Sequence, residues 1–149
     1  MKRCIPIVLV VGLLFSNCSK DEEKNLQLIK ARTFSINAPD GWTLIEDQGV
    51  DTYIGRITNE NTTIYFDQGH LSFGGLENVQ ENDETVYFSR THINGVPAII
   101  HKENTPHETS ASTRLSVYLD NGEKQNRLYV FDPDNDAFFI RIFKTHRFL

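Results

Sequence analysis

The chain has 149 residues, with 15 Lys and Arg against 20 Asp and Glu and a formal net charge of −5 at pH 7. That length fits a single domain with its own core. An acidic chain without a Lys/Arg cluster binds nucleic acid poorly, because neutralisation of phosphates drives that binding, so we expect no nucleic-acid partner.

The first predicted element is a secretory signal peptide. Lys2 and Arg3 are basic, and residues 5–15 are nearly all apolar. A basic start followed by an apolar run of about 7–15 residues is typical of such a peptide. The run is shorter than the roughly 20 residues that cross a membrane. The alternative, a core helix, is disfavoured because the run has no polar face.

The sequence LFSNC at residues 14–18 resembles a lipobox, where bacteria attach a diacylglycerol to the cysteine thiol and cleave just before it. Phe15 and Asn17 depart from the common pattern, and lipoproteins of Bacteroidota resemble this looser form. The resemblance implies removal of residues 1–17 and lipidation of Cys18. Cys4 lies in the removed segment, so Cys18 would have no partner for an intrachain disulfide. A disulfide between Cys4 and Cys18 is the alternative, but it would only close a loop within the signal sequence and serve no visible purpose.

Residues 18–25 are predicted to be the lipidated N-terminus and a flexible tether. Ser19 follows the cysteine where an Asp would resemble an inner-membrane retention signal, so we expect a lipid-anchored protein at the outer membrane. Residues 20–23 resemble the Lys-plus-acidic signal for the outer face of that membrane, although a short charged run is also an ordinary solvated tether. The periplasmic face and the cell surface therefore both stay open.

Residues 26–149 are predicted to form one β-rich globular domain. The segment 26–30 fits either a short helix or an edge strand. The later runs are rich in Val, Ile, Thr, Tyr and Phe, which suit a pleated surface, and turn residues separate them. The predicted strands are 33–37, 42–46, 52–58, 62–66, 85–93, 96–103, 113–119, 127–131 and 138–143. The fold class is mainly β (α+β is the alternative), an antiparallel, largely meandering sheet with at most one or two short helices.

An Asn-Gly pair at residues 94–95 is the strongest hairpin signal in the chain. A two-residue turn there pairs Ile93 with Val96 and Val86 with Glu103. Residues two apart on a strand share a face. The register therefore gathers four polar side chains on one side of the hairpin: Arg90, His92, His101 and Glu103.

This group would bind an anionic ligand or carry out acid–base chemistry. A solvated sheet face is the favoured alternative, because Val86, Phe88 and Ile99 would share it. The group is the candidate ligand site, although the ligand is not identified.

The histidines are the candidates for catalysis, and an envelope hydrolase would be built around His70, His92 or His101. No His-x-x-x-His or His-Glu-x-x-His spacing occurs, so no motif supports a metal site, although a site assembled in space stays open. No metal and no other cofactor is predicted. No Gly-x-Ser-x-Gly elbow is present either, and lipidation would remove Cys18 as a nucleophile. Residues 132–137 begin like a calcium loop, but Ala137 and Phe143 stand where Gly and Glu are needed, which favours a turn.

Two stretches carry a resemblance to known proteins. TFSINAPDGW (33–42) and GVDTYIGRI (49–57) resemble small Bacteroidota lipoproteins of uncharacterised function. Residues 34–42 also resemble the opening strand and turn of PsbP/Mog1-like domains, which implies an α+β fold with an antiparallel sheet used for binding. The sequence shows no pattern for the C-terminal helix of such domains, and neither resemblance supplies functional residues.

Together these features favour a lipid-anchored envelope or surface lipoprotein that acts as a binding or accessory module rather than an enzyme. Its expected partners are the membrane, through the lipid, and an envelope protein or a small molecule. The alternatives are the hydrolase and an immunity- or inhibitor-like protein.

Overall fold

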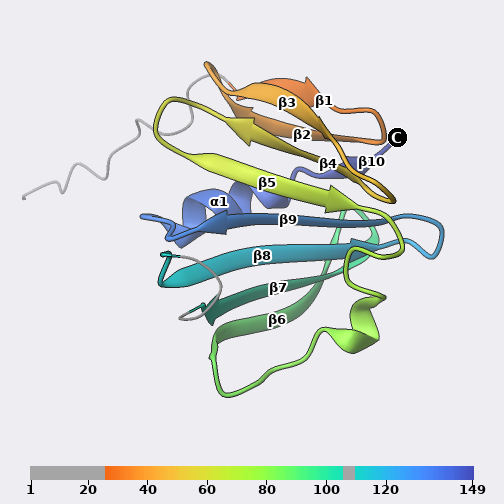
Figure 1. The fold of residues 1–149 in the computed structure, drawn as a ribbon, viewed down its shortest axis with the longest axis vertical. Helices are drawn as coiled ribbons and strands as arrows, with labels where there is room; N and C mark the ends of the chain where they lie inside the picture. The colour runs from red at the N-terminus through yellow and green to blue at the C-terminus, as the bar shows by residue number, and fades with distance from the viewer. Residues whose placement is uncertain (1–25, 106–109) are drawn as a thin grey trace, which may run out of the picture.

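A computed structural model describes residues 26–105 and 110–149 of the chain. The predicted signal peptide 1–17, Cys18 with the tether 18–25, and His107 lie outside the described residues. The described chain forms ten strands in two antiparallel sheets, one α-helix and one short 3-10 helix (Figure 1). The predicted fold class, mainly β with antiparallel pairing and few helices, is confirmed.

The larger sheet has seven strands in the order β3-β4-β5-β9-β8-β7-β6. It consists of two meanders, β3 to β5 and β6 to β9, whose last strands pair with each other along the middle of the sheet. The strands are β3 (Thr43–Gln48), β4 (Tyr53–Thr58), β5 (Thr63–Gln68), β6 (Thr85–Ile93), β7 (Val96–Asn104), β8 (Thr113–Asp120) and β9 (Gln125–Phe131).

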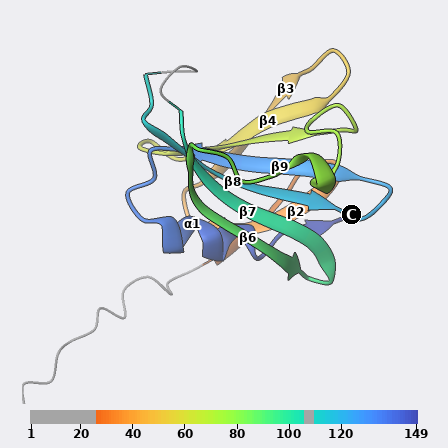
Figure 2. The same cartoon turned by 90° about the horizontal axis from the view of Figure 1, so that it is seen from below.

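The smaller sheet has three strands in the order β1-β2-β10, namely β1 (Leu26–Lys30), β2 (Phe34–Pro39) and β10 (Arg147–Phe148). The helix α1 (Asp136–Phe143) lies beside it, and the Thr145 hydroxyl after the helix accepts the β2 Asn37 N–H at 2.8 Å. The smaller sheet and α1 together form a layer on one face of the seven-stranded sheet, which we call the back layer (Figure 2).

The main core lies between the back layer and the seven-stranded sheet. Phe34 of β2 is fully buried there, with its ring 5.1 Å from that of Phe66 on β5 and 5.2 Å from that of His146. From the large sheet, alternate residues such as Ile100, Val117 and Leu128 point into this core, as expected for strands with one buried face.

A second, smaller cluster lies on the opposite face of the large sheet, which we call the outer face. The segment between β5 and β6, which contains the 3-10 helix η1 (Leu76–Asn78), folds over the β6–β8 half of this face. Val79 of this segment packs on Ile99 and Tyr118, with Phe73, Leu76 and Phe88 around them. Apart from η1, this segment has no regular secondary structure.

The strands predicted between residues 33 and 131 are confirmed with boundaries shifted by a few residues, and the segment 26–30 is an edge strand. The strand predicted at 138–143 is wrong, because these residues lie in α1. The side chain of Asn135 accepts the Phe138 N–H at 3.1 Å and begins the helix. The helix then buries Phe139, Ile142 and Phe143 at helical spacing, so packing overrides the strand preference of this aromatic run.

The predicted hairpin register is confirmed from the pair Ile93–Val96 to the pair Phe88–His101. It changes beyond Tyr87, where a bulge places Thr85 rather than Val86 opposite Glu103. The extra residue of the bulge shifts the pairing register by one residue at the start of β6, so Val86 does not oppose Glu103 as expected.

In the described part of the chain, no helix has the length and apolar character needed to pass through a membrane.

His146 is buried in the main core between the rings of Phe34 and Phe148, and its Nε2 lies 3.0 Å from the side-chain nitrogen of Asn126. Burial lowers the pKa of His146 to about 4. The folded chain therefore holds this imidazole neutral at pH values where an unfolded chain protonates it.

We predict that the free energy of unfolding falls as the pH drops from 6.5 to 4. Below pH 6.5 the unfolded chain takes up a proton at His146 and the folded chain does not, which costs about 1.4 kcal/mol per pH unit and about 3 kcal/mol over the window. Urea denaturation at pH 7 and pH 4.5 measures the loss. In the variant His146→Leu most of this pH dependence should disappear; an unchanged dependence would show that other groups cause it.

Candidate functional site

The three histidines considered for catalysis lie in different surroundings. His70 follows β5, is exposed, and lines a shallow pocket with Tyr53 and Lys124. His92 is exposed near the end of β6 and lines another shallow pocket with Arg90 and Ile99. His101 in β7 is buried. The structure therefore does not bring the three histidines together.

The predicted cluster of Arg90, His92, His101 and Glu103 consists of two buried and two exposed residues of the hairpin. His101 and Glu103 are buried side by side on the outer face of β7. Arg90 and His92 lie further along β6, where both are exposed and Arg90 Nη2 donates to the Val79 carbonyl at 3.3 Å. The register places all four side chains on one face, and burial separates them into two pairs.

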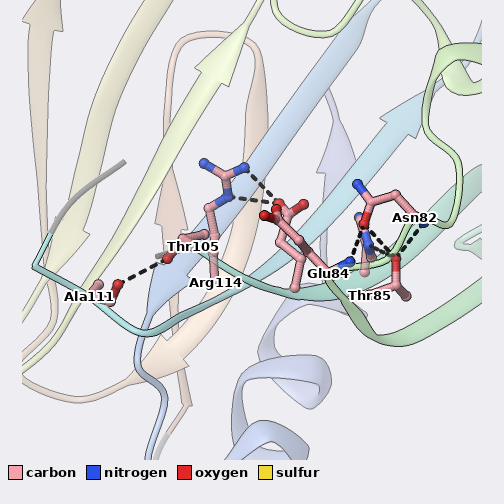
Figure 3. Close-up of polar contacts among 8 residues, drawn as sticks. Asn82, Glu84, Thr85, Thr105, Ala111 and Arg114 are labelled. Atoms are coloured by element: carbon pink, nitrogen blue, oxygen red, sulfur yellow. Dashed lines mark hydrogen bonds and ion pairs between the residues drawn. The ribbon is translucent and has the colours of Figure 1, made fainter. Parts of the chain in front are cut away.

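The partner of Glu103 is Arg114 of β8, which lies opposite it in the register. Arg114 Nε and Nη2 donate to Glu103 Oε1 at 3.1 and 2.6 Å, and the side chains are only 14% and 12% exposed (Figure 3). Close by, the Thr105 hydroxyl donates to the Ala111 carbonyl at 3.2 Å. These contacts join β8 to the end of β7 through buried polar groups.

The imidazole of His101 is hydrogen-bonded to the hydroxyl of Thr85 at the start of β6. Its Nε2 lies 3.1 Å from Thr85 Oγ1, which is 3.2 Å from Asn82 Oδ1 (Figure 3). The Phe88 ring meets the imidazole edge-on. Burial lowers the pKa of His101 below its usual value of 6.5, and the Glu103 carboxylate acts in the opposite direction. This environment holds the imidazole in a fixed position beneath the bulge.

Arg127 of β9 is sandwiched between two tyrosines in the centre of the outer face. Its guanidinium carbon lies 5.2 Å from the ring centre of Tyr118 and 4.7 Å from that of Tyr129. Within the described chain, Arg127 Nε and Nη2 are buried without a hydrogen-bond acceptor. Two oxygens near Arg127 in the register, Asp67 Oδ1 and Ser116 Oγ, are also buried without a hydrogen-bond partner in this part of the chain. The cation–π contacts fix the guanidinium while part of its donor capacity stays unused.

A pocket of about 450 Å³ opens where β5 and β9 separate. The two strands pair from Gln68 opposite Asn126 up to Tyr65 opposite Tyr129 and then diverge. Four aromatic rings wall the opening, those of Tyr65, Phe131, Phe138 and Phe139, and the remaining lining comes from the turn 61–63 and from residues 132–135. We call this the aromatic pocket.

Some polar groups of the aromatic pocket are already used by the fold. The Asp132 carboxylate accepts the N–H groups of Ser112 and Thr113 at 2.8–3.1 Å, and Asn135 caps α1. Asp134 is exposed at the rim. The pocket thus offers a ligand ring faces, hydroxyls and a carboxylate.

Among the residues that the structure describes, no group of three or more His, Cys, Asp or Glu side chains is arranged to hold a metal ion.

Sequence analysis missed Arg114 as the partner of Glu103, the Arg127 sandwich and the aromatic pocket. The first and the last depend on strands that no tight turn connects: residues 105–112 join β7 to β8, and β5 meets β9 from a distant part of the chain. The Arg127 sandwich lies between β8 and β9, which the four residues 121–124 connect. The sequence predicts the pairing register only where a two-residue turn joins the strands, so these contacts could not be predicted from it.

We predict that Glu103→Ala lowers the free energy of unfolding by about 3 kcal/mol, because it removes the carboxylate that accepts two hydrogen bonds from the buried guanidinium of Arg114. The matched control is Asp47→Ala, which breaks the Arg56–Asp47 pair, with both side chains 40% exposed, and should cost less than about 1 kcal/mol. Urea denaturation of both variants gives the two values. Equal losses would mean that the Glu103–Arg114 pair contributes no more than a surface pair.

Comparison with known proteins places the fold. No protein-family profile matches the sequence, and no curated protein matches it either. Among solved structures, the chain is similar to the solution structure of cyanobacterial PsbP (CyanoP) from Synechocystis sp. PCC 6803, with a TM-score of 0.62 at 10% sequence identity. The match covers 91% of this chain and 99% of that one.

A crystal structure from Bacteroides thetaiotaomicron also matches, with a TM-score of 0.46 and 16% identity over 78% of this chain and 45% of that one. The match to cyanobacterial PsbP confirms the resemblance noted at residues 34–42 as a similarity of fold. The helix α1 lies near the C-terminus, where the resemblance implied a helix that the sequence pattern did not show. The chain therefore has a PsbP-like fold.

Proposed function

We propose that this chain is a lipid-anchored envelope protein whose β domain is a binding or accessory module, and that the aromatic pocket is its ligand site. The observation that carries the binding role is the pocket itself: about 450 Å³, walled by four aromatic rings. Pockets with mainly apolar walls and a few polar groups are the usual places where proteins hold small ligands or side chains of a partner.

The pocket is built from rigid parts. Tyr65 stacks on Tyr129 with ring centres 5.3 Å apart, and Phe131 meets both rings edge-on. Phe138 meets Phe139 edge-on in α1. Rings held by their neighbours in this way lose little freedom when a ligand binds, which favours affinity.

The lining also indicates the chemistry of the ligand. No Lys, Arg or His is among the residues described at the lining, which carries the carboxylates of Asp132 and Asp134. Anionic ligands would be repelled there. The ring faces and oxygen acceptors fit a ligand, either a small molecule or a segment of an envelope protein, that presents an apolar or cationic surface and N–H or O–H donors.

The proposed anchor rests on the apolar run 5–15 and the LFSNC pattern that ends at Cys18. It would place the domain at the outer membrane, on the periplasmic face or at the cell surface. Several acyl chains on one cysteine hold a protein firmly, whereas a single chain does so only marginally.

Replacing the proposed lipid attachment site tests the anchor. We expect the Cys18→Ala chain to carry no lipid, because no thiol remains to receive it. The variant should leave the membrane fraction for the soluble fraction, or keep its signal sequence uncleaved. Cell fractionation and mass measurement of the wild-type chain check this result. Firm membrane association of a variant with the signal sequence removed would contradict the proposal.

Filling the pocket tests its role. Thr63 lines the aromatic pocket, so Thr63→Trp should occupy it, while Thr43→Trp places the same ring on the exposed edge strand β3. We expect a pull-down from intact cells with the tagged lipoprotein to lose its partner with Thr63→Trp and to keep it with Thr43→Trp. Identical captured sets for all three proteins would remove the pocket from the proposed function.

A further inference from the structure

The strand β1 exposes two leucines on the side of the molecule that faces away from the large sheet. Leu26 and Leu28 are 50% and 66% exposed, while Ile29, which alternates with them, is buried in the main core. Large apolar side chains that are exposed side by side on one strand face are a common mark of an interaction surface.

Cations adjoin these leucines on the same face of the smaller sheet. Lys30 lies opposite Ser35, and Ser35 lies opposite Arg147, so the three residues form one row across β1, β2 and β10. Lys30 and Arg147 are exposed at the two ends of this row. Paired residues in a sheet point to the same side, so the row shares its face with Leu26 and Leu28.

The helix adds two more cations on this side. α1 turns Phe139, Ile142 and Phe143 into the core, so the exposed Arg141 and, just after the helix, Lys144 project away from the large sheet. The carboxylate within α1, Asp136, is held by Lys102 Nζ at 2.8 and 2.9 Å. We call the six residues the back surface: Leu26, Leu28, Lys30, Arg141, Lys144 and Arg147.

The four cations of this surface contrast with the chain as a whole, whose net charge is −5. Between Cys18 and Leu26 the chain has only eight peptide steps, which reach at most about 28 Å when fully extended. A lipid on Cys18 would therefore hold β1 within about that distance of the bilayer.

We propose that the back surface docks on anionic lipid headgroups of the membrane that holds the anchor. The proposal rests on the lipid anchor of the proposed function. The cations meet headgroup phosphates, Leu26 and Leu28 enter the interfacial region, and the outer face of the large sheet points away from the membrane. Anchor and docking together fix the orientation of the domain.

Site-specific fluorescence in reconstituted vesicles tests the docking. The lipidated full chain is purified as Leu28→Cys or Leu71→Cys, labelled with a fluorophore, and reconstituted into phosphatidylcholine vesicles with or without phosphatidylglycerol and with a headgroup-attached quencher. Leu71 is a matched control, because it is 75% exposed and lies in the segment after β5. We expect strong quenching at position 28 and little at position 71, with the difference lost without phosphatidylglycerol or at high salt.

Charge reversal gives a second arm. Lys30→Glu with Lys144→Glu, made in the Leu28→Cys protein, should lower the ratio of docked to undocked protein by at least about fivefold for each cation removed. Arg56→Glu with Arg90→Glu, at two positions on the outer face, makes the same change in net charge and should leave the quenching intact.

The outcomes separate the two proposals. Equal quenching at positions 28 and 71 would overturn the docking and leave the anchor in place. Quenching at position 28 that is the same with and without anionic lipid would have the same consequence. A wild-type chain that does not float with the vesicles would overturn the anchor and the docking together. Self-association of the labelled chains, detected as energy transfer between them at position 28, would assign the leucines to a second copy instead and would likewise overturn the docking.

Discussion

Phe34 packs where the two layers of the molecule meet. Its ring, in β2, contacts Phe66 of β5 edge-on and stacks on His146, which precedes β10. One buried side chain thus joins the smaller sheet, the large sheet and the C-terminal segment. The pairing of β10 with β2 and the position of α1 both depend on this contact, because the chain after α1 reaches β2 through His146.

The location of the candidate sites follows from this packing. The back layer covers one face of the large sheet, and the segment around η1 covers only the β6–β8 half of the other. The aromatic pocket lies outside the region that the η1 segment covers, between the diverging ends of β5 and β9 and the start of α1. The two proposed contacts, with a ligand and with lipid, therefore use different parts of the surface.

Much of the fold was predictable from local chemistry. Strands with alternating apolar residues and an Asn-Gly turn fixed the β6–β7 hairpin down to Phe88 opposite His101. The bulge before Tyr87 was not predictable, because nothing in the sequence of β6 distinguishes a regular end from a bulged one. The helix was missed for a related reason: FFIRIF at 138–143 has strand-like composition, and eight residues are too few to show a helical period. Asn135 before that run was the available signal.

The candidate sites were less predictable than the fold. The sequence placed His101 and Glu103 on one face correctly, but their partners Thr85 and Arg114 come from a bulged end and from a strand joined by a long connection. Hydrophobic periodicity identifies which residues are buried and does not identify which distant strand lies beside them.

The join between β5 and β9 has a further consequence for how the chain folds. Every other pair of neighbouring strands in the large sheet is consecutive in sequence, so each meander can form from local contacts. The four residue pairs between β5 and β9 instead close a loop of about 60 residues, which costs more chain entropy than a hairpin does. This join is expected to form late and to set the folding rate, since non-local pairing is slow. The ligand pocket would then be completed late in folding.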